Sequence, residues 1–445
     1  MFSSSNVRIP LLRLLSLALC VLAAVWCMPG VIALRTTAVV VALLVVILLF
    51  PEWKQTLSRL PKPVYAWMLF IAVYPFIFSE NLALCLKVFR NQWYWTIILP
   101  MLGLAAGTLL SNRKNQLALF GVAFVFPILT QVFLGLKEIM RTHAFPYGFW
   151  GLHHHHDYFG YTAIHAISIL GPLLIFSPRK STRTAAVLVI CLSVFSTILA
   201  ASRAGLSFVL LTTLATVFVS LWVKTSPRLR HRILVMGLPV MMLFLTGVGT
   251  LAYRNDKTRW ARLQTRLAEG FQGDALKIVG EGPLVDGDTA RPLIARAAWT
   301  LAKYHPWGLD GTRQAYQTAM KRIYPQPVNN LDHSHNGWLD TCIALGYLGG
   351  ALYFIFLLSF AFEGFSRLLS SALEVRATAV SLVVLAAIWV LRGCFDSTFR
   401  DHMLQMQVFT LPFLYAFLLS SETRQEEVML GSVSMPRDSA PLPAI

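Results

Sequence analysis

The sequence predicts an all-α protein that crosses a membrane many times, and three observations support this fold class. Of its 445 residues, 56% are hydrophobic and only 13% are charged, whereas soluble globular domains carry about 25% charged residues. The apolar residues form runs of about 20, long enough to span a bilayer as helices. The formal charge of +17 comes from bases scattered between these runs, which is typical of loops flanking membrane helices. This composition excludes a soluble enzyme and a coiled coil, and it argues against nucleic-acid binding.

About twelve segments are predicted to be transmembrane helices. They are residues 11–28, 31–50, 63–79, 94–110, 116–135, 158–176, 184–201, 204–223, 232–252, 336–362, 377–391 and 402–420. The first follows Arg8 and Arg13 as a signal peptide would, but the many later apolar runs favour an uncleaved span. The six cysteines form no CxxC pair, so neither a zinc framework nor a disulfide scaffold is predicted.

The basic residues predict the orientation of these spans. With the N-terminus inside, the short inner segments hold 18 Lys and Arg, and the short outer segments hold 8. Cytoplasmic loops carry such an excess, and long loops do not count against it. Both termini are therefore expected in the cytoplasm. The predicted organisation is spans 1–9 over 1–252, a large outer loop over 253–335, spans 10–12 over 336–420, and a flexible cytoplasmic tail over 421–445.

The large outer loop is predicted to be folded and helical. A first helix is expected to start at Asn255 or Asp256 and to end at Gly270. A second is expected over 290–304, and a third from about Thr312 to Tyr324, before Pro325. Residues 271–289, which contain four glycines, are predicted to be irregular.

Ala201-Ser202-Arg203-Ala204-Gly205 lies between the seventh and eighth spans, on the outer side. Ser202 is a suitable N-cap for the eighth span. Arg203 would then occupy the first helical turn, where the helix dipole disfavours a cation. A bound anion there would satisfy both the guanidinium and the free N–H groups. The alternative is an interfacial arginine that reaches the lipid headgroups.

Arg296 begins a second pattern, R-x-x-x-W, which is followed by His305-Pro306-Trp307-Gly308. An arginine binds phosphate through two parallel hydrogen bonds. A solvated helix face is the alternative explanation, and Arg291, Arg313 and Lys303 compete for the same role.

His335 lies in Asp332-His333-Ser334-His335-Asn336-Gly337, which opens the tenth span. A helix N-terminus favours the neutral form of an imidazole, and a neutral imidazole is a usable general base. His333 is the alternative base, and Asn336 is a secondary candidate. Either histidine could instead merely cap the helix.

Other polar features are weaker candidates. The run His153–His156 with Asp157 suggests a metal site, but four consecutive histidines cannot all face one ion. Asp286-Gly287-Asp288 has the spacing of a metal–nucleotide-sugar site, yet it lies in the outer loop, so a turn is favoured. His165 lies within the sixth span, where an ionisable group is a functional candidate. No metal site and no cofactor are predicted.

Together these features resemble the O-antigen ligase and O-antigen polymerase superfamily, which includes bacterial protein O-oligosaccharyltransferases. The resemblance rests on twelve spans, the outer S-R-A-G turn, one large loop after the ninth span, R-x-x-x-W with HPWG, and HSHN at the next span. Gly308-Leu309-Asp310-Gly311 departs from the simpler G-x-G that the family leads us to expect.

The resemblance implies a GT-C-like glycosyltransferase of the bacterial inner membrane with a periplasmic active site. The donor would be a glycan on undecaprenyl diphosphate, and in the ligase the acceptor would be lipid A–core. By motif, Arg203 and Arg296 would bind the diphosphate, and His335 would act as the base without a metal. A polymerase and a protein O-oligosaccharyltransferase remain alternatives. A secondary transporter is the alternative of a different class, although the ionisable residues cluster at one face rather than along a pathway.

Overall fold

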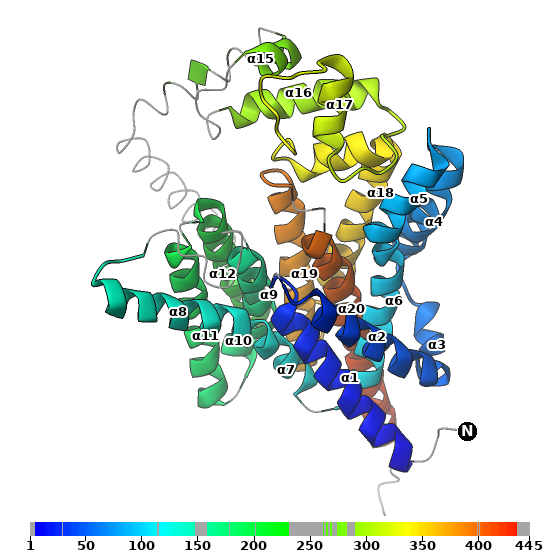
Figure 1. Cartoon of the computed structure of the whole chain (residues 1–445). Coiled ribbons are helices and arrows are strands. Elements are labelled where there is room, and N and C mark those ends of the chain that lie inside the picture. The colour runs from blue at the N-terminus through cyan, green and yellow to red at the C-terminus, as the bar shows by residue number, and fades with distance from the viewer. Residues whose placement is uncertain are drawn as a thin grey trace, which may run out of the picture.

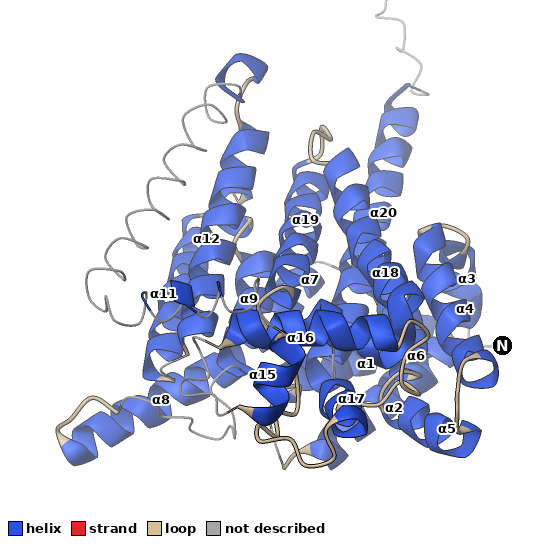
Figure 2. Cartoon of the chain, turned by 90° about the horizontal axis from the view of Figure 1, so that it is seen from above, coloured by secondary structure: helices blue, strands red, loops and turns tan. Residues whose placement is uncertain are grey.

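The computed structural model describes residues 5–28, 30–113, 115–146, 158–177, 179–200, 202–230, 274–282, 290–397, 399 and 401–433, with a few positions between 261 and 268. All regular elements in these ranges are helices, and none of the residues is in a strand (Figure 2). Within the described residues, eight helices are long and apolar enough to cross a membrane, or nine if the bent pair Ile32–Leu48 and Phe50–Leu57 counts as one. The predicted all-α membrane fold is confirmed.

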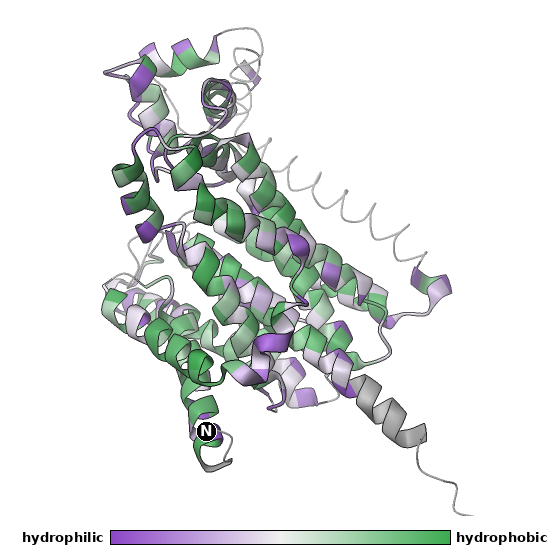
Figure 3. Ribbon diagram, turned by 90° about the vertical axis from the view of Figure 1, so that its right-hand side faces the viewer, coloured by the Kyte–Doolittle hydropathy of each residue, from purple (hydrophilic) through white to green (hydrophobic). Residues whose placement is uncertain are grey.

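The bundle consists of the following helices, of which α19 and α20 lie near its centre (Figure 1). They are α1 (Ser5–Val25), α2 (Ile32–Leu48), α3 (Phe50–Leu57), α4 (Lys62–Ile77), α5 (Leu82–Asn91), α6 (Trp95–Ser111), α7 (Gln116–Ala123), α8 (Val125–Thr142), α9 (Tyr158–Leu170), α10 (Leu173–Phe176), α11 (Lys180–Leu199), α12 (Arg203–Lys224), α18 (Gly337–Ser366), α19 (Leu373–Gly393) and α20 (Asp401–Val433). Apolar residues predominate along these helices, and hydrophilic residues concentrate towards their ends (Figure 3).

The helices differ from the predicted spans mainly at breaks and ends. The second predicted span is α2, and the chain bends by 90° between α2 and α3 at the end of that span. The sixth predicted span is broken between α9 and α10 at Gly171-Pro172, where proline cannot donate a helical hydrogen bond. The last helix, α20, continues to Val433 instead of ending at 420. The predicted ninth span, 232–252, lies outside the described residues, and each other predicted span has a helix at its position.

The large loop carries α15 (Ala275–Glu281), α16 (Arg291–Tyr304) and α17 (Ala315–Ile323), which lie across one end of the bundle (Figures 1 and 2). Helices α16 and α17 confirm two of the expected helices. The first expected loop helix falls on residues that are largely outside the described part of the chain. The prediction that 271–289 is irregular is wrong for α15, because the Asp274 carboxylate accepts the N–H groups of Leu276 and Lys277 and so caps a helix.

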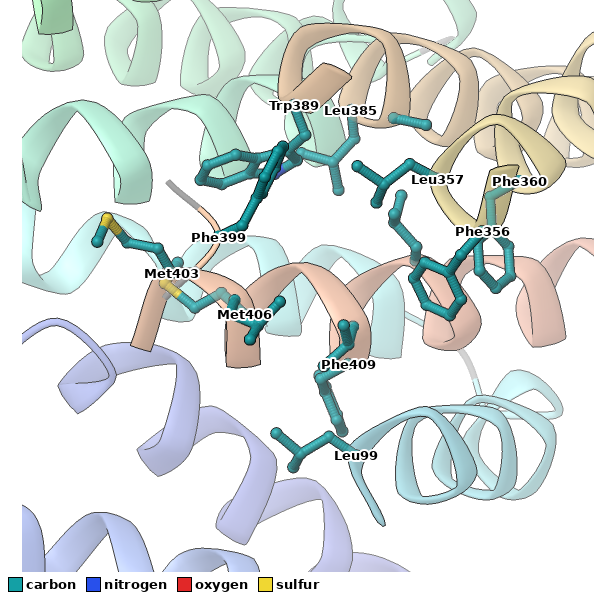
Figure 4. Close-up of a cluster of buried hydrophobic side chains, with 14 of the residues drawn as sticks. Leu99, Phe356, Leu357, Phe360, Leu385, Trp389, Phe399, Met403, Met406 and Phe409 are labelled. Carbon is teal, nitrogen blue, oxygen red and sulfur yellow. The ribbon is translucent and has the colours of Figure 1, made fainter. Parts of the chain in front are cut away.

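The core of the bundle lies where α6, α18, α19 and α20 meet. Trp389 of α19, Phe356 of α18 and Phe409 of α20 are all buried there (Figure 4). Gly103 and Gly107 bring α6 against the backbone of α20, because a Cβ on Gly107 would lie 2.7 Å from the Ala416 Cβ. Small residues four apart allow this close approach in membrane helices. This core holds the connection between α19 and α20 beside the start of α18.

Candidate active site

The HSHN segment forms the turn that begins α18. Asn336 caps the helix, since its side-chain oxygen accepts the Leu339 N–H at 3.0 Å. Ser334 Oγ donates to the Asn336 carbonyl at 3.0 Å, and the Ser334 N–H donates to Asp340 Oδ1, also at 3.0 Å. The side-chain oxygen of Asn336 therefore has a structural role, and the turn around the histidines is fixed by hydrogen bonds.

His335 occupies the left-handed region of backbone space, with φ of 56°. This conformation is uncommon for a residue with a side chain and costs on the order of 1–2 kcal/mol. The centroids of the His333 and His335 rings are 4.5 Å apart, and the rings are inclined at 62°. The turn thus brings both predicted imidazoles together, and backbone strain of this kind is often kept at functional sites.

Asp396, in the connection between α19 and α20, adds a carboxylate to this site. Its Oδ2 accepts the Tyr161 hydroxyl at 2.8 Å, and its Oδ1 accepts the Ser397 N–H at 2.8 Å. Burial disfavours the charged carboxylate, but the charge of Arg392, the Tyr161 hydrogen bond, and the charges of His333 and His335 outweigh it. Together they hold the pKa of Asp396 below its ordinary value. A carboxylate therefore stays ionised in the field of the two histidines.

Two hydrogen bonds to backbone carbonyls tie the histidine turn to this connection. The Gly337 N–H donates to the Asp396 carbonyl at 3.0 Å, and Asn336 Nδ2 donates to the Cys394 carbonyl at 3.1 Å. Ser397 Oγ also donates to the Asp340 carboxylate. The start of α18 and the end of α19 therefore form one unit.

Arg392, in the last turn of α19, is fully buried and lies behind Asp396. Its Nη2 is 3.5 Å from Asp396 Oδ2. Its guanidinium carbon lies 4.0 Å from the centroid of the Tyr161 ring and 5.2 Å from that of Phe208. A buried cation needs a counter-charge, and aromatic faces add an attraction. Arg392 thus links α9, α12 and α19 to the carboxylate.

The N-terminus of α12 contacts the same region. Ser202 is its N-cap, as predicted, and Ser202 Oγ accepts the Gly205 N–H at 2.9 Å. A Cβ on Gly160 would lie 2.9 Å from Gly205 Cα and 3.3 Å from Arg392 Nη1. Arg203 is the first residue of α12, so its backbone is within one turn of this contact. The placement of the Arg203 side chain lies outside what the structure describes.

The candidate arginines of the loop lie on the same end of the bundle. Arg296 is exposed on α16, and Arg291 is half-buried at the start of that helix. The C-terminal part of α16 packs on α18, where the ring centroids of Trp299 and Tyr347 lie 6.4 Å apart. Arg313 instead pairs with Asp401 at 2.7 Å, so its charge is already matched. Binding of a diphosphate by Arg291 or Arg296 stays a prediction.

The HPWG segment docks the loop on the bundle. The Trp307 ring stacks on Phe78 with centroids 5.4 Å apart, and the Tyr74 hydroxyl donates to the Trp307 carbonyl at 2.9 Å. Gly308 has φ of 93°, and a Cβ there would lie 2.6 Å from the Ala344 carbonyl oxygen and 2.7 Å from the Gly346 nitrogen. Gly346, at φ 78° and ψ 173°, kinks α18. The glycine of the HPWG motif therefore packs directly against the kink in α18.

His165 packs in the core rather than facing the histidine turn. It is fully buried, and its Nδ1 donates to the Tyr161 carbonyl at 2.9 Å. Its ring lies 4.9 Å from that of Phe124 and 5.5 Å from that of Trp389. These contacts favour a packing role over the intramembrane functional role considered from the sequence.

In the part of the chain that the structure describes, no group of three His, Cys, Asp or Glu side chains is arranged to hold a metal ion. The run His153–His156, together with Asp157, Asp286 and Asp288, lies outside that part of the chain.

Comparison with known proteins agrees with the motifs gathered at this site. The family model described as O-antigen ligase matches residues 186–354. Over these residues the chain is similar to O-antigen ligases. The O-antigen ligase match runs from within α11 into α18, so it includes Arg203, Arg296 and His335, whereas Arg392 and Asp396 lie beyond it. No curated protein matched the chain.

Arg392, Asp396 and Tyr161 are the residues of the site that the motifs did not indicate. Arg392 and Asp396 are four residues apart at the end of a span, a spacing that places two charges on one helix face. An ionisable residue at the edge of a membrane span is also a functional candidate. Tyr161 has no comparable signal, since an aromatic residue in an apolar helix is ordinary.

Proposed function

We propose that this protein is an O-antigen ligase, which transfers O-antigen polysaccharide from undecaprenyl diphosphate to lipid A–core. The reaction would take place at the periplasmic face of the bacterial inner membrane, with both termini in the cytoplasm. The family match supports an enzyme of the O-antigen ligase or polymerase type, and the apolar helices support a multi-pass membrane protein. The observation that carries the proposal is the gathering of His333, His335 and Asp396 beside the N-terminus of α12.

In the proposed reaction, His335 accepts the proton of the acceptor hydroxyl as its oxygen attacks the anomeric carbon. The new carbon–oxygen bond forms while the bond from that carbon to the diphosphate breaks. The diphosphate departs with the electron pair. Attack from the face opposite the leaving group inverts the anomeric centre, as in one-step glycosidases.

Asp396 would stabilise the histidine once it is protonated. Its carboxylate is kept ionised, and a fixed negative charge lowers the free energy of a neighbouring imidazolium. Because Asp396 senses the charges of both His333 and His335, either ring could serve as the base. His335 is preferred because of its strained backbone.

Positive charge for the departing diphosphate would come from Arg203 and Arg296. Charge on the leaving group grows in the transition state, and preorganised guanidinium groups stabilise it. We expect transfer to be independent of a divalent metal. Purified protein should retain its rate in a chelator, and a loss restored only by added metal would contradict this expectation.

The decisive experiment is deletion of the gene, followed by electrophoresis of lipopolysaccharide. Loss of the whole ladder with accumulation of undecaprenyl-linked polymer would support the ligase. Core plus a single repeat would indicate a polymerase. An unchanged ladder would overturn the proposal and leave the protein glycosyltransferase or the transporter, and solute uptake without a glycan phenotype would identify the latter.

Complementation of the deletion tests the residues. His335→Ala and Arg203→Ala are each expected to abolish the ladder at normal protein levels, and Arg296→Ala to reduce it strongly. Arg141→Ala is the matched control, because Arg141 is an exposed residue that pairs with Glu138 on α8. A full ladder from His335→Ala together with none from His333→Ala would reassign the base to His333.

A further inference from the structure

The structure contains a polar cavity of about 280 Å³. The helix ends that line it are at the end of the bundle opposite α15–α17 (Figure 1). Four segments that are distant in the sequence line it, namely α1, the region of α3, the end of α6 and the later part of α20. Most of its walls are hydroxyl, amide or charged side chains, among them Thr423 and Asn112. Such a cavity needs a polar occupant.

Three arginines and one carboxylate face this cavity. Arg8 is paired with Glu52, with Nε 2.9 Å from Oε2, so these two charges cancel. Arg59 Nη1 donates to Thr423 Oγ1 at 3.4 Å, and Arg424 Nη2 donates to the Ser111 carbonyl at 2.9 Å. Both of these acceptors are neutral.

Glu422, two residues before Arg424 on α20, does not offset this charge. It pairs instead with Arg367, with Oε1 2.7 Å from Nε. The guanidinium groups of Arg59 and Arg424 are therefore held in place by neutral acceptors, and positive charge is in excess among the described side chains that line the cavity.

We propose that this cavity binds the phosphate group of an anionic lipid headgroup. Guanidinium groups match phosphate oxygens in geometry and charge, and the hydroxyl and amide groups around them can complete the hydrogen bonds. The position favours a lipid over free phosphate, because the cavity lies at the ends of apolar helices, where headgroups are found.

Basic residues at helix ends often only orient a membrane protein. The exposure of an arginine there would therefore not identify a binding site. What distinguishes this one is that arginines from three separate elements converge on one cavity. The proposal is independent of the glycan transfer proposed above, since it concerns the opposite end of the bundle.

The test is native mass spectrometry of the full-length protein in detergent, titrated with phosphatidylglycerol or with phosphatidylcholine. We expect a preference for phosphatidylglycerol that Arg59→Gln and Arg424→Gln each weaken about tenfold, the effect of one lost charge-assisted hydrogen bond. Arg228→Gln is the matched control, because Arg228 is an exposed arginine after α12 and outside the cavity. An equal loss in Arg228→Gln would mean non-specific attraction and would overturn the proposal.

A second variant tests the cavity without changing charge. Ser420 lines it, and Ser420→Leu would fill part of the space, so it should also weaken phosphatidylglycerol binding. Unchanged binding in Ser420→Leu would refute the cavity as the site. A competition arm uses inorganic phosphate: displacement of the lipid by phosphate at equal concentration would show that free phosphate is the ligand and would refute the lipid assignment.

Discussion

Replacement of Asp396 by asparagine tests the link between the buried arginine and the histidine turn. Asparagine has nearly the same shape, and its side-chain oxygen can still accept the Tyr161 hydroxyl, but its amide nitrogen cannot then accept the Ser397 N–H. What it removes is the negative charge that faces Arg392 and the two histidines. Two effects are therefore expected, one on stability and one on transfer.

The effect on stability follows from the geometry of the pair. Arg392 Nη2 and Asp396 Oδ2 are 3.5 Å apart, and the side chains are 0% and 16% exposed, so water screens them little. Unit charges about 4 Å apart attract by about 4 kcal/mol at an effective dielectric constant of about 20. Removing one partner of a buried pair costs about 3–5 kcal/mol. Asp396→Asn can keep the Tyr161 hydrogen bond but loses the one from the Ser397 N–H. It should therefore lower the free energy of unfolding by about 3–5 kcal/mol.

The effect on transfer should be separable from the effect on stability. General acid–base catalysis contributes about 10²–10⁴-fold to a rate, and loss of the charge that supports the imidazolium should cost about 100-fold. Adding Arg392→Gln removes the buried cation, so the double variant should regain much of the stability while transfer stays low. Unfolding in mixed detergent micelles and transfer from purified donor to lipid A–core measure the two quantities. Recovery of transfer together with stability in the double variant would refute a catalytic contribution by Asp396.

Three further predictions concern the backbone contacts and the loop. Gly160→Ala would push α9 from α12, because its Cβ would meet Gly205 Cα at 2.9 Å, and transfer should fall at least about tenfold since small displacements at a site are costly; Gly135→Ala, whose Cβ meets only the Leu199 side chain, should keep its rate. Gly308→Ala should lower the free energy of unfolding by about 1–3 kcal/mol, and an unchanged melting midpoint would contradict the docking described for HPWG. Burial, with a smaller effect from Arg322, lowers the pKa of His305, so the neutral form is favoured in the folded state. The contribution of His305 to stability is present above about pH 6.5 and is lost as the pH falls. The melting midpoints of wild type and His305→Gln should therefore converge as the pH is lowered from about 7.5 to about 5.5.

Local signals in the sequence predicted the elements that position the site. Ser202, the predicted N-cap, marks the N-terminus of α12. HSHN marks the start of α18 as predicted, although the cap there is Asn336 and not a histidine. Each depends on a residue's own backbone neighbours, so a single sequence suffices to find it. Helix α15 escaped prediction because its glycines outweighed the cap formed by Asp274.

Long-range contacts could not be predicted in this way. Asp396 and His335 lie far apart in the sequence, and only the packing of α19 and α20 in the core brings the Asp396 carboxylate into the field of the imidazole. Only the structure explains why two residues, and not the one of G-x-G, separate Gly308 from Gly311. Both glycines have positive φ, and the N–H groups of Leu309 and Gly311 both donate to the Ala344 carbonyl at 2.9 Å.

The backbone and the side chain of Asp396 have different roles at the histidine turn. Gly337 and Asn336 bond to carbonyl oxygens of Asp396 and Cys394, so the histidine turn is held by the backbone of the connection. The side chain of Asp396 takes no part in these bonds to the turn. Substitution of its carboxylate therefore changes the charge that His335 senses while the bonds that fix the His335 backbone are kept. A catalytic defect in Asp396→Asn would accordingly report on electrostatics, whereas a defect from altering the length of this connection would report on geometry.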